Sequence, residues 1–136
     1  MLPNDNFIVL RSEGGVIDFV GKQGCTWGPF LIALSMNGVP LDLTGYKIRG
    51  QMRKKINAPN AETGLVFAIE DPLTGVISIS MVDEDSAALT CRDTYLDSQS
   101  TYYWDMEIFT EDPDPIEVYR YLSGKIYVSA EVTRDA

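Results

Sequence analysis

Apolar and polar residues alternate with a period of two along most of the chain, which is the pattern of β-strands that bury one face. Residues 46–55 show it clearly, because Tyr46, Ile48 and Met52 share one parity while the other parity is polar and mostly basic. Further segments with this alternation are residues 65–70, 77–81, 102–109, 116–122 and 126–132, with candidate strands at 15–20 and 27–35. The pattern therefore predicts about seven or eight short strands.

Turn-forming residues separate these segments. Asn37-Gly38 is a strong tight-turn dipeptide, and residues 71–75 (DPLTG) predict a hairpin turn. Gly28-Pro29 predicts a break or bulge near the start of its strand, and Ser123-Gly124 predicts a turn or bulge between two strands. Residues 111–115 contain two prolines, which lack the backbone donor of a central strand, so we expect an exposed loop there.

Residues 83–91 break the alternation. Acidic residues open this segment and helix formers follow, so we expect one short helix that Asp83 caps. Many short strands with one short helix predict an all-β fold, an antiparallel β-sandwich. No repeat or linker divides the chain, so residues 1–136 are expected to form a single domain, with residues 1–10 as an arm or an edge strand.

The alternation also predicts the core. Trp104 lies on the apolar parity of its strand and is expected to be a core anchor, whereas Trp27 is open between a core anchor and a ligand platform. Ser78 and Ser80 are expected to point outward. The residues expected to be mostly buried are Ile48, Met52, Phe67, Ile69, Ile77, Ile79, Trp104, Met106, Ile108, Ile126, Val128 and Val132.

Composition excludes several kinds of partner. The chain has 20 acidic and 11 basic residues and a formal net charge of −9, so it repels phosphate backbones and nucleic acid is not expected to bind. The longest apolar run, residues 30–34, is far shorter than the roughly 20 residues that cross a bilayer, and the N-terminus lacks a signal-peptide pattern. We therefore expect no membrane partner and synthesis in the cytoplasm. Cys25 and Cys91 are expected to be free thiols, with one disulfide as the alternative.

The sequence offers little catalytic chemistry. It contains no histidine, which removes Ser-His-Asp and Cys-His systems, and it has no nucleotide-binding or nucleophile motif. Asp105 and Glu107 share a strand face at a spacing that a glycosidase pair can use, but paired acids are common on exposed strand faces. Residues 111–114 are acidic without the spacing of a calcium loop. We expect no enzyme activity, no metal and no cofactor.

Four of the eleven basic residues share one strand face, and we call Lys47, Arg49, Arg53 and Lys55 the basic stripe. It is expected to be either a solvated face or a contact surface for an acidic neighbour. The acidic residues that could pair with it, within the chain or between copies, are Asp105, Glu107, Glu111, Asp112, Asp114 and Glu117. The aromatic residues that could form an interface core or a sugar-binding face are Tyr103, Phe109, Tyr119, Tyr121 and Tyr127.

Five motifs occur in a fixed order over roughly residues 32–134. In residues 38–53 (GVPLDLTGYKIRGQMR), Asp42 and Thr44 can bond the local backbone and Gly45 can take a positive φ, so a turn leads into the strand. The other motifs are residues 71–80 (DPLTGVISIS), 85–89 (DSAAL), 103–107 (YWDME) and 122–134 (LSGKIYVSAEVTR). Together these motifs resemble a pattern of small proteins from the structural gene clusters of tailed phages.

The chain is similar to the N-terminal domain family of upper baseplate proteins of lactococcal phages, Ig-like sandwiches that attach host-binding parts to the tail. The resemblance implies an Ig-like fold and a non-catalytic virion protein of the phage tail, an adaptor, baseplate or fibre-attachment component. Its partners would be other tail or baseplate proteins and copies of itself. A long extension follows the domain in that family, whereas this chain ends at Ala136, so we expect an adaptor, collar or baseplate element without a receptor-binding domain. The alternative is a carbohydrate-binding β-sandwich involved in host adhesion.

Overall fold

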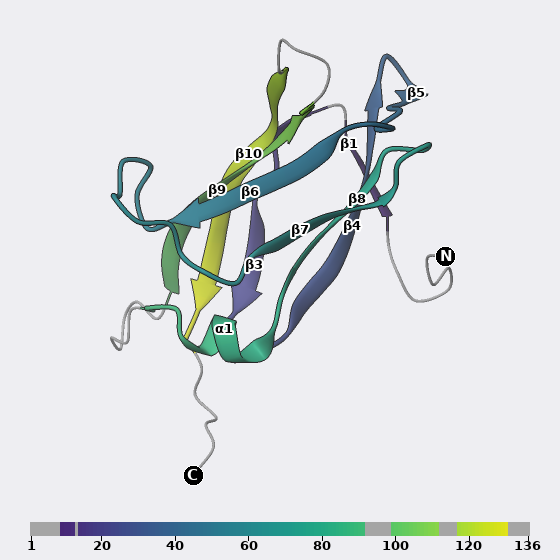
Figure 1. The fold of residues 1–136 in the computed structure, drawn as a ribbon. Helices are drawn as coiled ribbons and strands as arrows, with labels where there is room; N and C mark the ends of the chain where they lie inside the picture. Colours follow the sequence, from purple (N-terminus) through teal and green to yellow (C-terminus); the bar gives the residue numbers. More distant parts are fainter. Residues whose placement is uncertain (1–8, 13, 92–98, 112–116, 131–136) are drawn as a thin grey trace.

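The computed structural model describes residues 9–12, 14–91, 99–111 and 117–130, which form two facing β-sheets with one helix at an end of the sandwich (Figure 1). The strands of the described residues are β1 (Val9–Ser12), β2 (Gly15–Val16), β3 (Phe19–Lys22), β4 (Trp27–Met36), β5 (Val39–Pro40), β6 (Lys47–Arg53), β7 (Val66–Asp71), β8 (Val76–Met81), β9 (Gln99–Phe109) and β10 (Val118–Ser129). The helix α1 covers Asp83–Ala87. The expected all-β sandwich is confirmed; the number of strands is higher than expected because two of them, β2 and β5, have only two residues.

The order of the strands is that of immunoglobulin-like sandwiches, in which strands A, B, E and D form one sheet and C, F and G form the other. The first sheet has the order β1-β4-β8-β7, with β5 also paired to β4. The second has the order β2-β10-β9-β6, with β3 also paired to β10. β1, β4, β8 and β7 therefore occupy the places of A, B, E and D, and β6, β9 and β10 those of C, F and G.

The sheets depart from pure antiparallel pairing at the beginning of the described chain. β1 pairs with β4 in parallel, and β2 and β3 both pair with β10 in parallel. Parallel neighbours need long connections rather than hairpins, and here the chain between β3 and β10 includes most of both sheets. The N-terminal segment thus contributes to one sheet and then to the other, which a pattern of alternating residues does not reveal.

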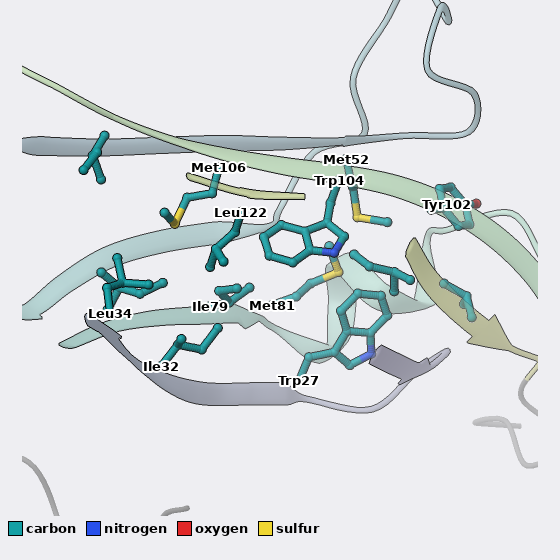
Figure 2. Close-up of a cluster of buried hydrophobic side chains, with 14 of the residues drawn as sticks. Trp27, Ile32, Leu34, Met52, Ile79, Met81, Tyr102, Trp104, Met106 and Leu122 are labelled. Carbon is teal, nitrogen blue, oxygen red and sulfur yellow. The ribbon is translucent and has the colours of Figure 1, made fainter. Parts of the chain in front are cut away.

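Two tryptophans fill the middle of the sandwich, as Figure 2 shows. In antibody domains a disulfide joins strands B and F; here those strands carry Trp27 on β4 and Trp104 on β9, which are 2% and 3% exposed. Phe19 packs edge-on against both indoles, with ring centroids 6.5 Å from Trp27 and 5.7 Å from Trp104. Both indole N–H groups donate to backbone carbonyls, those of Lys22 and Ile17. Trp27 is therefore a core anchor and not an exposed ligand platform.

Tyr102 corresponds to the tyrosine corner of this fold. That residue lies two positions before the second cysteine of antibody domains, and its hydroxyl bonds to backbone upstream. Tyr102 lies two positions before Trp104, is 1% exposed, and donates its hydroxyl to the Thr90 carbonyl 12 residues earlier. This bond anchors the connection between β8 and β9. Burial raises the pKa of Tyr102 to about 12.

Most of the expected core is buried, and the differences have local causes. Ile48, Phe67 and Ile69 are half-buried and pack against the edge of the core, and Val132 lies outside the described residues. Ser78 faces away from the core as expected but is only 4% exposed, and its hydroxyl donates to Glu70 Oε1 at 2.7 Å. β8 is flanked by strands on both sides, so its outward residues are covered more than those of an edge strand.

Most turn predictions are confirmed. Asn37 and Gly38 both have positive φ in the hairpin between β4 and β5, and the Thr44 amide donates to Asp42 Oδ1 at 2.9 Å. The register of β4 shifts beside Gly28-Pro29, as expected for a bulge. No disulfide joins Cys25 and Cys91 in the structure, and the Cys91 thiol donates to the Val128 carbonyl at 3.0 Å.

Two local predictions are wrong. The segment at Ser123-Gly124 is not a turn, because β10 continues through it and the bulge lies between Arg120 and Leu122. Gly124 instead permits close packing, since a Cβ there would lie 1.9 Å from the Ile17 carbonyl oxygen. Asp83 does not cap α1; the N-cap position is Val82 without a side-chain hydrogen bond, and the first-turn acids meet the positive end of the helix.

Candidate interaction face

The outward side chains of β6, β9 and β10 form rows across the second sheet, and we call this surface the charged face. The strand register places Glu107 between Arg49 and Arg120, and Tyr103 between Arg53 and Lys125. Asp105 lies between Gln51 and Ser123, and Phe109 lies between Lys47 and Val118. The central strand β9 therefore carries acids and aromatics, and the two flanking strands carry cations.

Two residues of the basic stripe pair with acids of the same molecule. Arg49 Nε donates to Glu107 Oε1 at 2.8 Å, and Lys47 Nζ donates to Glu111 Oε2 at 2.9 Å. The Arg49 guanidinium also lies 4.4 Å from the centre of the Phe109 ring, a cation–π distance. The intramolecular cross-strand pairing that the sequence left open is thus present for half of the stripe.

The other two stripe residues do not form salt bridges with the described residues. Arg53 donates from Nη1 to the Ala58 carbonyl at 2.8 Å and from Nη2 to Gln51 Oε1 at 2.9 Å. It thereby supports the loop that follows β6. Lys55 lies in that loop, beyond the end of β6, and is exposed. The stripe therefore divides into a paired half on the sheet and a half associated with the loop.

The remaining candidate residues are spread over the same sheet. Asp105 is half-buried on β9, and Tyr127 is half-buried on β10 between Thr101 of β9 and Val20 of β3. Asp112 lies outside the described residues, as does Asp114. Glu117 is exposed, and its carboxylate raises the pKa of the neighbouring Tyr119.

The candidate aromatic residues do not form one cluster. Tyr103, Phe109 and Tyr127 belong to the charged face. Tyr121 instead packs against the core, and its hydroxyl donates to the Ser35 carbonyl of the opposite sheet at 2.8 Å. The bulge in β10 reverses the parity between Arg120 and Leu122, which turns Tyr121 inward.

A groove crosses the charged face, with a volume of about 540 Å³. Its floor includes Arg53, Tyr103 and Asp105, and its lining also includes Arg120 and Lys125 of β10. Arg120 and Lys125 were not selected from the sequence as site residues. The alternation of β10 was a signal for Lys125, but the bulge obscured the parity of Arg120. Five of the eleven basic residues of the chain thus lie on one sheet face, namely Lys47, Arg49, Arg53, Arg120 and Lys125.

Asp105 and Glu107, the carboxylate pair considered from the sequence, do not share the groove. Asp105 lines it, whereas Glu107 is engaged by Arg49 outside it. Among the described residues there is no group of three or more Cys, Asp or Glu side chains that could hold a metal ion. Within that same part of the chain, no helix has the length and apolarity needed to cross a membrane. No protein-family model and no curated protein matches the sequence.

Proposed function

We propose that this protein is a non-catalytic structural component of a tailed-phage particle, located in the tail as an adaptor, baseplate or fibre-attachment element. It acts through permanent contacts with other tail or baseplate proteins and with copies of itself. The resemblance of five sequence motifs to the upper baseplate domain family supports the phage setting. The Ig-like order of strands is compatible with that family.

The observation that carries the proposal is the charged face. In a protein of net charge −9, five of eleven basic residues lie on one sheet face. Three of them, Arg53, Arg120 and Lys125, form no salt bridge with the described residues. Exposed charges contribute little to folding stability, but complementary charges orient partners and fix the register of a complex. The face is therefore suited to a partner with an acidic surface.

The experiment is mass spectrometry of gradient-purified tailed particles from cells that carry the gene. The protein should be present at a fixed ratio to the major tail protein, while a non-structural protein of the same phage should be depleted. A reconstruction of the particle should then show the charged face in a contact that buries more than about 1,000 Å² in total. Absence of the protein from purified particles would contradict the proposal.

The second candidate is a carbohydrate-binding sandwich for host adhesion. The observation in its favour is Tyr103, a half-buried aromatic residue in the groove beside Asp105 and Gln51. Binding of the isolated protein to purified host cell-wall polysaccharide would support this function. If the protein binds carbohydrate through this groove, the Tyr103→Ala variant should lose that binding.

A further inference from the structure

The groove on the charged face is a transverse trough. Its lining comes from β6, β9 and β10, from Val16 of β2, and from Ile56 in the loop after β6. Neighbouring strands lie about 4.8 Å apart, so the floor is about 14 Å wide from β2 to β6. An extended peptide rises about 3.3 Å per residue, so about four residues would cross it.

The groove lining carries three cations, Arg53, Arg120 and Lys125, and two carboxylates, Asp18 and Asp105, so positive charges outnumber negative charges by one. Arg53 and Lys125 flank Tyr103 in one row, two strand spacings or about 10 Å apart. Arg53 is held in place by the Ala58 carbonyl and Gln51 and forms no salt bridge with the residues that the structure describes. Arg120 and Lys125 are exposed and form no salt bridge with the described residues. Asp18, which also lines the groove, accepts the backbone N–H of Lys125.

The two ends of the trough are apolar. Val16 at the β2 end is 74% exposed, and Ile56 at the β6 end is 80% exposed. Aliphatic side chains at such exposure contribute little free energy to folding. They contribute free energy to binding when a partner covers them. Cations between two exposed aliphatic residues match a peptide that carries both carboxylates and apolar side chains. A polysaccharide would match less well, because the groove offers one half-buried tyrosine and its tryptophan, Trp104, has its indole in the core.

We propose that this groove binds an extended acidic segment of a neighbouring protein, with acidic residues two or three positions apart and an apolar residue at each end. The inference rests on the proposed assembly function and names the chemistry of the partner. The acidic residues would contact Arg53, Arg120 and Lys125, which supply charge-assisted hydrogen bonds. The apolar residues would cover Val16 and Ile56.

The test measures binding of a fluorescent peptide of alternating glutamate and leucine to the full chain by anisotropy. The variant Arg120→Gln/Lys125→Gln removes two cations of the groove. Its matched control, Lys54→Gln/Lys55→Gln, removes the same charge from exposed positions outside the groove lining. The groove variant should bind at least about tenfold more weakly, while the control changes by less than about twofold. Thermal melts should be unchanged for both.

Further arms separate the sources of binding. Val16→Ser should weaken binding severalfold without altering charge, and a peptide with glutamine in place of glutamate should not bind. Equal loss in the groove variant and in its control would overturn the proposal, because it would indicate only the net charge of the protein. Binding of polygalacturonate with the same dependence on Arg120 and Lys125, without peptide binding, would overturn it in favour of a glycan site. None of these results depends on whether the protein is found in particles.

Discussion

The two sides of β9 differ sharply although their residues alternate along a single strand. On the inward side, Tyr102, Trp104, Met106 and Ile108 are each at most 4% exposed and meet the opposite sheet. On the outward side, four residues are half-buried and lie beside mostly polar and charged residues of β6 and β10, namely Tyr103, Asp105, Glu107 and Phe109. Burial of large apolar groups contributes far more free energy than exposed ion pairs do. One side of β9 should therefore determine stability and the other should determine contacts.

The largest expected effect comes from the inward side. Trp104→Ala should lower the free energy of unfolding by about 3–5 kcal/mol, because the indole is buried against Phe19 and stacked 6.0 Å from Phe67. Urea denaturation followed by circular dichroism measures it. The outward neighbour Tyr103→Ala should cost about 1 kcal/mol or less. Equal costs for the two variants would contradict the division between the two sides.

Close packing of the neighbouring strand β10 is the second largest effect. Gly124→Ala should cost about 1–3 kcal/mol, because its Cβ would collide with the Ile17 carbonyl and separate β2 from β10. The outward neighbour Ser123→Ala is the control and should stay within about 0.5 kcal/mol of the wild type. Thermal denaturation by calorimetry compares the three proteins. A stable Gly124→Ala variant would show that the strands can separate there without loss.

A smaller effect depends on pH and on the buried phenol of Tyr102. Its pKa is about 12 in the folded state and about 10 when unfolded, since burial disfavours the phenolate. The stability that comes from keeping this phenol protonated is complete below pH 10. Between pH 10 and 12 it is lost, because the unfolded state releases the Tyr102 proton more readily than the folded state does. The melting temperature should therefore fall more steeply over that range in the wild type than in Tyr102→Phe. Identical pH profiles for the two proteins would contradict this role.

The smallest effect belongs to the outward ion pair. A double-mutant cycle with Arg49→Ala and Glu107→Ala should give a coupling free energy of about 0.2–1 kcal/mol, since both side chains are partly exposed. Raising the salt concentration should reduce it further. Chemical denaturation of the four proteins provides the measurement. A coupling near that of a buried contact would mean that the charged face stabilises the fold and is less free to bind partners.

The fold was largely predictable because the inward and outward residues alternate so regularly. Met52 of β6 and Trp104 of β9 are directly paired on neighbouring strands, and both are buried as the alternation predicts. The parallel pairing of β2 and β3 with β10 could not be predicted, because the paired residues are about a hundred positions apart. The pairing also depends on close packing of the Ile17 carbonyl against Gly124. A glycine that permits close packing and a glycine that permits a turn look the same in a sequence.

The site was predictable only in part. The period of two placed Lys47 and Arg49 on one exposed face, and it also placed Glu107 on the outward side of its strand. Which acid meets which base depends on the register between strands, and a one-residue shift would have changed every pair. The alternation could not place Arg120 on this face, because a bulge follows it in β10. The groove could not be predicted either, because it is formed by strands and a loop that come together only on folding.

The parallel pairing of β3 with β10 also has a consequence for synthesis of the protein. The Lys125 amide of β10 donates to Asp18, 107 residues earlier, so β2 and β3 cannot pair with β10 until about a hundred further residues have been translated. Contacts between such distant residues slow folding, because a long loop must close before any of them forms. Nascent chains stalled before β10 leaves the ribosome should therefore remain sensitive to protease at residues 14–22. The second sheet can therefore form completely only after β10, which pairs with β2, β3 and β9, has emerged.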